Sequence, residues 1–262
     1  MKMEMNNLWG DTMPYALEGD DFIPVIKAYP GKSKGAVVVF PGGAYEMRAT
    51  HEGDGLGEWF QKNGITAFVV EYRVSPNRHP AELSDAMRAV KYVRIYADKY
   101  GIDKDKIAVM GFSAGGHLAG SVSVHYDKDI YEPTDEIDKE STKPNASILC
   151  YPVIDMGEYR HDGSRKNLIG SEPDEKLIDY FSLQKHVTED TPGAFIWHTS
   201  TDNGVSVMNS VLYARALSEK RIPYEMHIYP VGDHGLGLSE NLPYVSKWSR
   251  DLLEWLKMRG WN

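Results

Sequence analysis

Short apolar runs alternate along this chain with segments whose apolar residues recur every three or four positions. Between the runs, helical spacing over residues 83–97, 205–216 and 245–255 predicts helices. This alternation predicts an α/β fold with a mostly parallel central sheet and helices on both faces. Residues 21–28 are expected to add an early strand at the sheet edge. The runs that predict buried strands are residues 36–40, 66–70, 107–110, 147–153, 194–197 and 224–229.

Two stretches interrupt the alternation. Residues 127–145 read DKDIYEPTDEIDKESTKPN, contain few core-forming side chains and are expected to form a plain solvated loop. Residues 156–191 have mixed polarity, with a helix expected near 174–179. We expect them to form a small cap insertion over a site, because long loops in compact domains are often lids. The sequence has no internal repeat, and a single domain over residues 1–262 is predicted.

The charge and cysteine content exclude several classes of protein. The 29 Lys and Arg against 38 Asp and Glu give a net charge of −9, whereas nucleic-acid binding needs a basic surface. No apolar run approaches the roughly 20 residues needed to cross a bilayer, and residues 1–10 lack the apolar core of a secretory signal. Cys150 is the sole cysteine, which excludes an intramolecular disulfide and suits a reducing compartment. These features predict a cytoplasmic protein with no nucleic-acid or membrane partner.

A possible nucleophile lies directly after a predicted strand and before a helix-compatible run. Residues 111–115 read GFSAG and match the G-x-S-x-G pattern, which in this context presents a reactive serine at a sharp turn. The turn is expected to strain the backbone of Ser113. Side chains at positions 111 and 115 would clash there, which explains both glycines. The alternative interpretation is a glycine-rich turn that only packs a helix on a strand.

A serine hydroxyl is a weak nucleophile and needs a base, which in turn needs a group to orient it. In this arrangement the acid and then the base follow the serine along the chain. His234 lies in a glycine-flanked loop after the predicted strand 224–229 and is the expected base. Asp202 follows the strand 194–197 and is the expected acid, with Asp155 as its alternative.

Acyl transfer also needs hydrogen-bond donors for the negatively charged oxygen of the tetrahedral intermediate. One expected donor is the N–H of Ala114, the residue after the serine. The others are the N–H groups of Gly43 and Ala44, in the PGGAY turn of residues 41–45. Tyr45 and Trp197 are expected to line a substrate pocket, although packing is the alternative role for both.

Together these motifs resemble the α/β-hydrolase superfamily of serine esterases, and most of all its small, acetylxylan-esterase-like carbohydrate acetyl esterases. The resemblance runs from about residue 24 to the C-terminus and rests on PGGAY at 41–45, GFSAGGH at 111–117, Asp202 and GDHG at 232–235. The stretch EYRVSP at 71–76 is similar to scaffolding in these esterases, which implies structural roles for Arg73 and Asp85. The hormone-sensitive-lipase-like branch has His-Gly-Gly-Gly in place of residues 41–44, so the sugar-esterase group is favoured.

The resemblance implies a serine carboxylesterase that releases short acyl groups, acetyl above all, from carbohydrates or similar small esters. No metal or cofactor is expected, since the sequence has no HExxH, no paired cysteines and no GxGxxG after the first strand. An arylformamidase or other amide hydrolase with the same triad is an alternative. A second alternative is a non-catalytic ligand-binding protein on the same scaffold, although such proteins typically lack the nucleophile or the base. A homodimer is left open.

Overall fold

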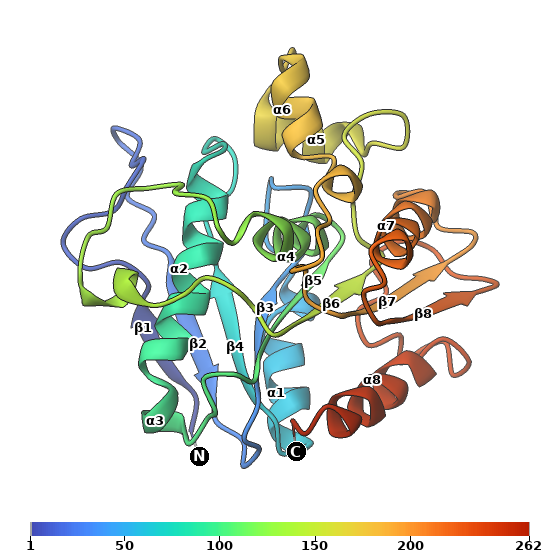
Figure 1. Ribbon diagram of the computed structural model, residues 1–262, viewed down its shortest axis with the longest axis horizontal. Coiled ribbons are helices and arrows are strands. Elements are labelled where there is room, and N and C mark those ends of the chain that lie inside the picture. Colours follow the sequence, from blue (N-terminus) through green and yellow to red (C-terminus); the bar gives the residue numbers. More distant parts are fainter. Residues whose placement is uncertain (1, 262) are drawn as a thin grey trace.

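An eight-stranded sheet runs through the structure, a computed structural model that describes residues 2–261. Its strand order is β1-β2-β4-β3-β5-β6-β7-β8, and β3 to β8 are all parallel (Figure 1). The predicted mostly parallel sheet is therefore confirmed. The strands are β1 (Glu4–Asn7), β2 (Val25–Tyr29), β3 (Ala36–Phe40), β4 (Thr66–Glu71), β5 (Ile107–Phe112), β6 (Ala146–Cys150), β7 (Ala194–Thr199) and β8 (Tyr224–Tyr229).

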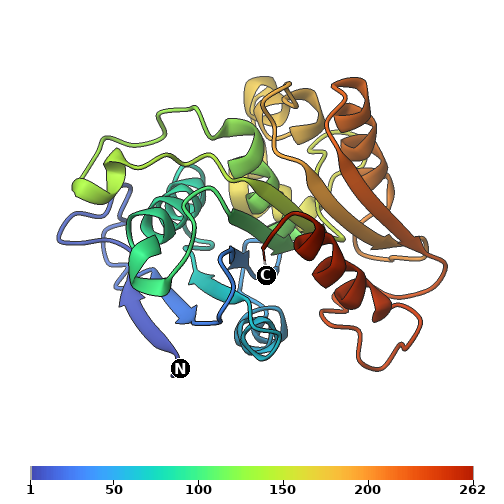
Figure 2. The ribbon, with the colours of Figure 1, turned by 60° about the horizontal axis from the view of Figure 1, so that its bottom comes forward.

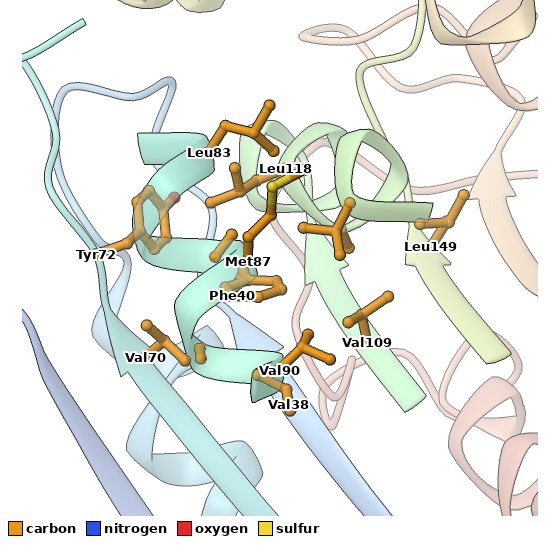
Figure 3. Close-up of a cluster of buried hydrophobic side chains, with 14 of the residues drawn as sticks. Val38, Phe40, Val70, Tyr72, Leu83, Met87, Val90, Val109, Leu118 and Leu149 are labelled. Atoms are coloured by element: carbon orange, nitrogen blue, oxygen red, sulfur yellow. The ribbon is translucent and has the colours of Figure 1, made fainter. Parts of the chain in front are cut away.

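Alternate side chains of the central strands enter two cores on opposite faces of the sheet. From β3, Val38 and Phe40 belong to one core, whereas Val37 and Val39 belong to the other. Figure 3 shows the first core, where side chains of the sheet meet those of α2 and α4. Burial on both faces explains why these strands are almost continuously apolar. The first core is covered by α2 (Ala81–Ile95), α4 (Ala114–His125) and α7 (Met208–Glu219), and the second by α1 (Asp54–Lys62) and α8 (Lys247–Met258).

The amino-terminal edge of the sheet differs from the prediction. The strand expected over residues 21–28 is β2, and it is second from the edge, because β1 pairs with it antiparallel from Glu4 opposite Ala28 to Asn7 opposite Val25. β1 reads EMNN, and its Met5 side chain is 62% exposed. A short edge strand without apolar alternation has no pattern by which the sequence can predict it.

Residues 127–145 form a loop that is mostly exposed or half-buried, as expected, but it is not a plain solvated loop because it has buried anchors. The segment contains a 3₁₀ turn (Glu136–Lys139), and the buried carboxylate of Asp138 lies 3.0 Å from the guanidinium of Arg88. Asp135 pairs with the same guanidinium at 2.5 Å, and the Tyr131 hydroxyl donates to Asp138 at 2.6 Å. Arg88 is buried on α2, so its ion pairs with the two aspartates hold the segment against that helix.

Residues 156–191 contain α5 (Asp162–Ile169), α6 (Glu175–Tyr180) and a 3₁₀ turn (Leu183–Lys185), so the helix expected near 174–179 is present. Figures 1 and 2 show α5 and α6 at one end of the molecule, outside the helices that flank the sheet. Asn167 of α5 donates to the carbonyl of Ala44 at 2.9 Å, which places this segment beside the carboxyl end of β3. A short helix, α3 (Ala97–Tyr100), extends α2. Among the described residues, no helix has the length and apolar character needed to span a bilayer.

Candidate active site

The serine of the GFSAG motif lies in the turn between β5 and α4, with φ 53° and ψ −118°. This backbone region is rarely occupied by residues other than glycine and costs about 1–3 kcal/mol. A Cβ at position 111 would lie 1.9 Å from the carbonyl oxygen of Gly115, and a Cβ at Gly115 would lie 2.1 Å from that of Phe40. The expected strain at Ser113 and the need for both glycines are therefore borne out by the geometry.

Three side chains expected to act together meet at the carboxyl ends of the strands. The Nε2 atom of His234 lies 2.7 Å from the Oγ of Ser113, and its Nδ1 lies 2.8 Å from Oδ2 of Asp202. A carboxylate only accepts hydrogen bonds, so Nδ1 carries the proton and Nε2 is free to accept from the serine hydroxyl. This is the arrangement in which an imidazole can withdraw the proton of a nucleophile.

The side chain of Asp202 is almost completely buried and is held by several donors. Its Oδ1 accepts the backbone N–H groups of Gly204 at 2.9 Å and Val205 at 2.8 Å. Its Oδ2 lies 3.2 Å from Nε2 of His198, in addition to its contact with His234. Burial by itself raises the pKa of Asp202, but the hydrogen bonds from both histidines and from Val205 outweigh it and hold the pKa well below its usual range. The Asp202 carboxylate is therefore ionised in the folded protein at neutral pH.

Asp155, the alternative acid, lies in a different environment. Its Oδ2 accepts the backbone N–H of Tyr159 at 2.9 Å, and its Oδ1 accepts from the side chain of Gln184 at 2.8 Å. Both contacts lie within the segment 156–191, so Asp155 stabilises the base of that segment. The structure brings Asp202, and not Asp155, to His234.

The PGGAY turn lies directly against the serine. A Cβ at Gly42 would be 3.1 Å from the Cβ of Ser113. Gly43 has φ 126° and Ala44 has φ 57°, so the turn follows a path that favours small residues. Across the described chain, no acceptor pairs with the backbone N–H of Gly43 or Ala44, nor with that of Ala114 in the first turn of α4. The three expected donors are thus free to bind an oxygen.

Tyr45 and Trp197 do not line a pocket, and that expectation is wrong. Neither side chain has any exposed surface. The Tyr45 hydroxyl lies 2.8 Å from Nδ1 of His117, and the Trp197 ring stacks on Trp248 with 4.9 Å between the ring centroids. Both rings extend into the cores on either side of the sheet, so they support the site through packing.

The segment 156–191 borders the PGGAY turn. A Cβ at Gly163 would lie 3.8 Å from the Cβ of Ala44. Burial lowers the pKa of His161, which lies in the same segment. Within residues 2–261, no group of three or more His, Cys, Asp or Glu side chains is arranged to hold a metal ion.

The sequence analysis missed two residues behind the triad, Glu52 and Tyr151. The Tyr151 hydroxyl donates to Oε1 of Glu52 at 2.6 Å, and Oε2 accepts the backbone N–H of Gly42 at 2.8 Å. The Tyr151 ring packs edge-on against the His234 ring, with 5.1 Å between centroids. Burial raises the pKa of Glu52, while the bond from Tyr151, the charge of His51 and the bond from Gly42 oppose that rise. A glutamate in a polar stretch gives no sequence pattern that predicts such burial.

A mostly parallel sheet with a serine elbow after β5, an aspartate after β7 and a histidine after β8 is the α/β-hydrolase fold. The chain belongs to the BD-FAE family, whose sequence profile matches residues 26–217. Ser113 and Asp202 lie inside the matched span, and His234 lies beyond it.

Individual relatives agree with this assignment. The solved structure of an acetyl ester-xyloside bifunctional hydrolase from Caldicellulosiruptor lactoaceticus is 41% identical, with a TM-score of 0.94 over 98% of this chain and 97% of that chain. Endo-1,4-beta-xylanase B of Butyrivibrio fibrisolvens is 40% identical over 95% of this chain and 40% of its own length. Acetylxylan esterase of Xylanibacter ruminicola is 36% identical over 85% of this chain and 45% of its own length. The predicted resemblance to acetylxylan-esterase-like enzymes is confirmed, and the chain spans less than half the length of these two curated relatives.

Proposed function

We propose that this protein is a serine carboxylesterase that removes short acyl groups, acetyl above all, from carbohydrate esters. The observation that carries the proposal is the continuous line of hydrogen bonds from Asp202 through His234 to Ser113. The substrate class is supported by the names of two relatives, an acetylxylan esterase and an acetyl ester-xyloside hydrolase. In the proposal the enzyme works without a metal or cofactor, on a small-molecule ester.

The reaction proceeds in two steps. The Oγ of Ser113 attacks the ester carbonyl while Nε2 of His234 takes its proton. The tetrahedral intermediate collapses, His234 gives the proton to the departing sugar oxygen, and an acetyl-serine remains. A water molecule then loses a proton to His234 as it attacks the acetyl group. His234 returns this proton to Oγ of Ser113 as acetic acid leaves, which ionises to acetate near neutral pH. Asp202 holds the tautomer in which Nε2 can accept, and it stabilises the imidazolium.

The negative charge on the carbonyl oxygen forms beside unpaired backbone donors. We assign the N–H groups of Gly43, Ala44 and Ala114 to this oxyanion. Each such donor is worth about 3 kcal/mol of barrier when it is aimed in advance at the developing charge. The free N–H groups and the closeness of the turn to the serine support the assignment.

The segment 156–191 is the cap in this proposal. Asn167 of this segment donates to the carbonyl of Ala44, so we assign the segment to the alcohol half of the ester, beside the oxyanion turn. The homodimer and the cytoplasmic location stay predictions from the sequence.

The test is hydrolysis of p-nitrophenyl esters from acetyl to octanoyl and of acetylated xylooligosaccharides. Wild type is compared with Ser113→Ala and with Ser123→Ala. Ser123 is a buried serine on α4, and among the described residues its hydroxyl donates to the carbonyl of Ala119 alone. We expect acetate to be released fastest by wild type and Ser123→Ala, with Ser113→Ala inert but folded. Turnover of N-formylkynurenine without ester turnover would instead identify an amide hydrolase. Ligand binding that survives in Ser113→Ala, with no turnover in wild type, would identify a binding protein.

A further inference from the structure

We propose that Glu52 and Tyr151 are a pair of positioning residues that hold the oxyanion turn and the loop of the base in one fixed relation. The inference rests on the proposed function, since it concerns the same reaction. Glu52 lies at the end of the 3₁₀ turn Thr50–Glu52, before α1, and Tyr151 lies directly after β6. Both side chains are buried, and neither touches Ser113 through a hydrogen bond in the structure.

One end of the pair fixes the oxyanion turn. The peptide unit between Pro41 and Gly42 is bonded on both sides: Oε2 of Glu52 accepts its N–H at 2.8 Å, and the hydroxyl of Tyr72 donates to its carbonyl oxygen at 2.6 Å. With the plane of this peptide fixed, the next two N–H groups along the chain, those of Gly43 and Ala44, stay unpaired beside the serine. Glu52 therefore sets the direction of the proposed oxyanion donors.

The other end fixes the loop of the base. The Tyr151 hydroxyl accepts the backbone N–H of Gly237 at 2.8 Å while it donates to Glu52 at 2.6 Å. Next to Glu52, Nε2 of His51 lies 2.9 Å from the carbonyl oxygen of Gly235. Two residues that follow His234 are thus held by two residues adjacent in the chain: Gly235 directly by His51, and Gly237 by Glu52 through Tyr151.

The backbone of Tyr151 shows that the surrounding structure holds this residue firmly. Its φ is 36°, in the left-handed region that bulky side chains rarely occupy. Such a conformation persists only where surrounding contacts fix it, and it is often found at active sites. Here the conformation places the ring edge-on against the His234 ring and directs the hydroxyl to Glu52.

The charge of Glu52 adds an electrostatic effect to this geometry. Both carboxyl oxygens accept a hydrogen bond, from Tyr151 and from Gly42, which is the pattern of a carboxylate. The imidazole of His51 lies beside it, with Nε2 3.7 Å from Oε1 of Glu52. A buried negative charge near His234 favours the imidazolium that forms as the serine attacks. A glutamine would instead turn an amide N–H toward one of the two donors.

The test compares Glu52→Gln and Tyr151→Phe with two matched controls. Glu82→Gln changes a buried carboxyl that has no hydrogen bond from any other residue of the described chain, and Tyr213→Phe removes a buried hydroxyl that also has none. Steady-state kinetics with p-nitrophenyl acetate are measured from acid to neutral pH, together with thermal unfolding. We expect Glu52→Gln to lose on the order of tenfold to 100-fold in kcat, with KM changed less than about threefold.

The split between kcat and KM and the double variant separate positioning from a merely structural role. Without the Glu52 charge, the imidazolium that forms during the reaction loses a favourable interaction, so kcat should fall further in Glu52→Gln than in Tyr151→Phe, with KM changed little in both. Because the two act as one unit, the losses in the double variant should be smaller than the product of the single losses. If Glu52→Gln does not fold, Tyr151→Phe carries the test alone through its kcat.

The outcomes distinguish this inference from the proposed function. If wild type turns over no ester, the proposed function fails. If wild type is active and both variants keep the kcat of wild type, the positioning role fails while the esterase stands. Equal losses in the two controls would likewise overturn it, because any buried change would then have the same effect.

Discussion

Replacement of Asp202 by asparagine tests the role of the acid with the least change in shape. Oδ1 is fixed by two backbone donors, the N–H groups of Gly204 and Val205, so the amide oxygen of an asparagine must occupy that position. Its NH₂ group then faces His234 and His198, where wild type has an accepting oxygen. Turning the amide over would only move the mismatch to the two backbone donors.

The size of the effect follows from this forced orientation. An amide N–H opposite Nδ1 of His234 favours the tautomer with a proton on Nε2, and that nitrogen can no longer accept the proton of Ser113. In a serine protease the same exchange lowers kcat about 10⁴-fold, which corresponds to roughly 5.5 kcal/mol of barrier. We expect Asp202→Asn to lose kcat by about 10³- to 10⁴-fold, with KM nearly unchanged, because Asp202 is buried away from the substrate.

The assay is p-nitrophenyl acetate hydrolysis at neutral pH, with thermal unfolding as a check on the fold. Asp155→Asn is the matched control, since Asp155 is also buried, also follows a strand and also accepts a backbone N–H. It should keep kcat within about threefold of wild type, because it makes no contact with the base. Our reasoning is refuted if Asp202→Asn keeps more than about a tenth of wild-type kcat, or if Asp155→Asn loses as much.

Other buried features predict measurable effects as well. Gly115→Ala should lower both the melting temperature and kcat, because its Cβ would lie 2.1 Å from a carbonyl oxygen of β3. A variant that unfolds at the same temperature as wild type would contradict this. Asp85→Asn removes the negative charge that pairs with the buried guanidinium of Arg73 and should cost about 3–5 kcal/mol in urea unfolding. Glu136→Gln, which breaks an exposed pair, should cost less than about 1 kcal/mol. Burial raises the pKa of Glu82 from 4.5 to about 8, so the folded state favours the protonated acid and loses stability as pH rises between these values. Urea unfolding across that range should show this slope in wild type and lack it in Glu82→Gln, and identical slopes would count against it.

The features predicted from sequence are those whose cause lies in neighbouring residues. A strand covered on both faces must be apolar along its whole length, so β3 and β5 can be found from their composition alone. The serine elbow requires glycines at fixed positions because backbone atoms lie within 2.1 Å of where a Cβ would stand. The order of acid and base along the chain then points to the loops of Asp202 and His234.

The features that were missed depend on partners far away in the chain. Glu52 is buried because Tyr151 donates to it across 99 positions, and Arg88 is neutralised by Asp135 across 47. The periodicity of apolar residues in the sequence does not predict such long-range pairs. The roles of Tyr45 and Trp197 were misjudged for a related reason: a position next to a motif does not show toward which side of the sheet a ring extends.

The order of the strands has a consequence for the growing chain. The elbow of Ser113 is held by β3, β5 and β6, which all precede residue 151, whereas the acid and the base follow β7 and β8 on the outer side of the sheet. During synthesis the elbow can therefore be in place while both of its partners, Asp202 and His234, have not yet left the ribosome. Under the proposed function, hydrolysis would begin only once the last two strands have been added to the sheet. The onset of activity during translation would then mark when that edge docks.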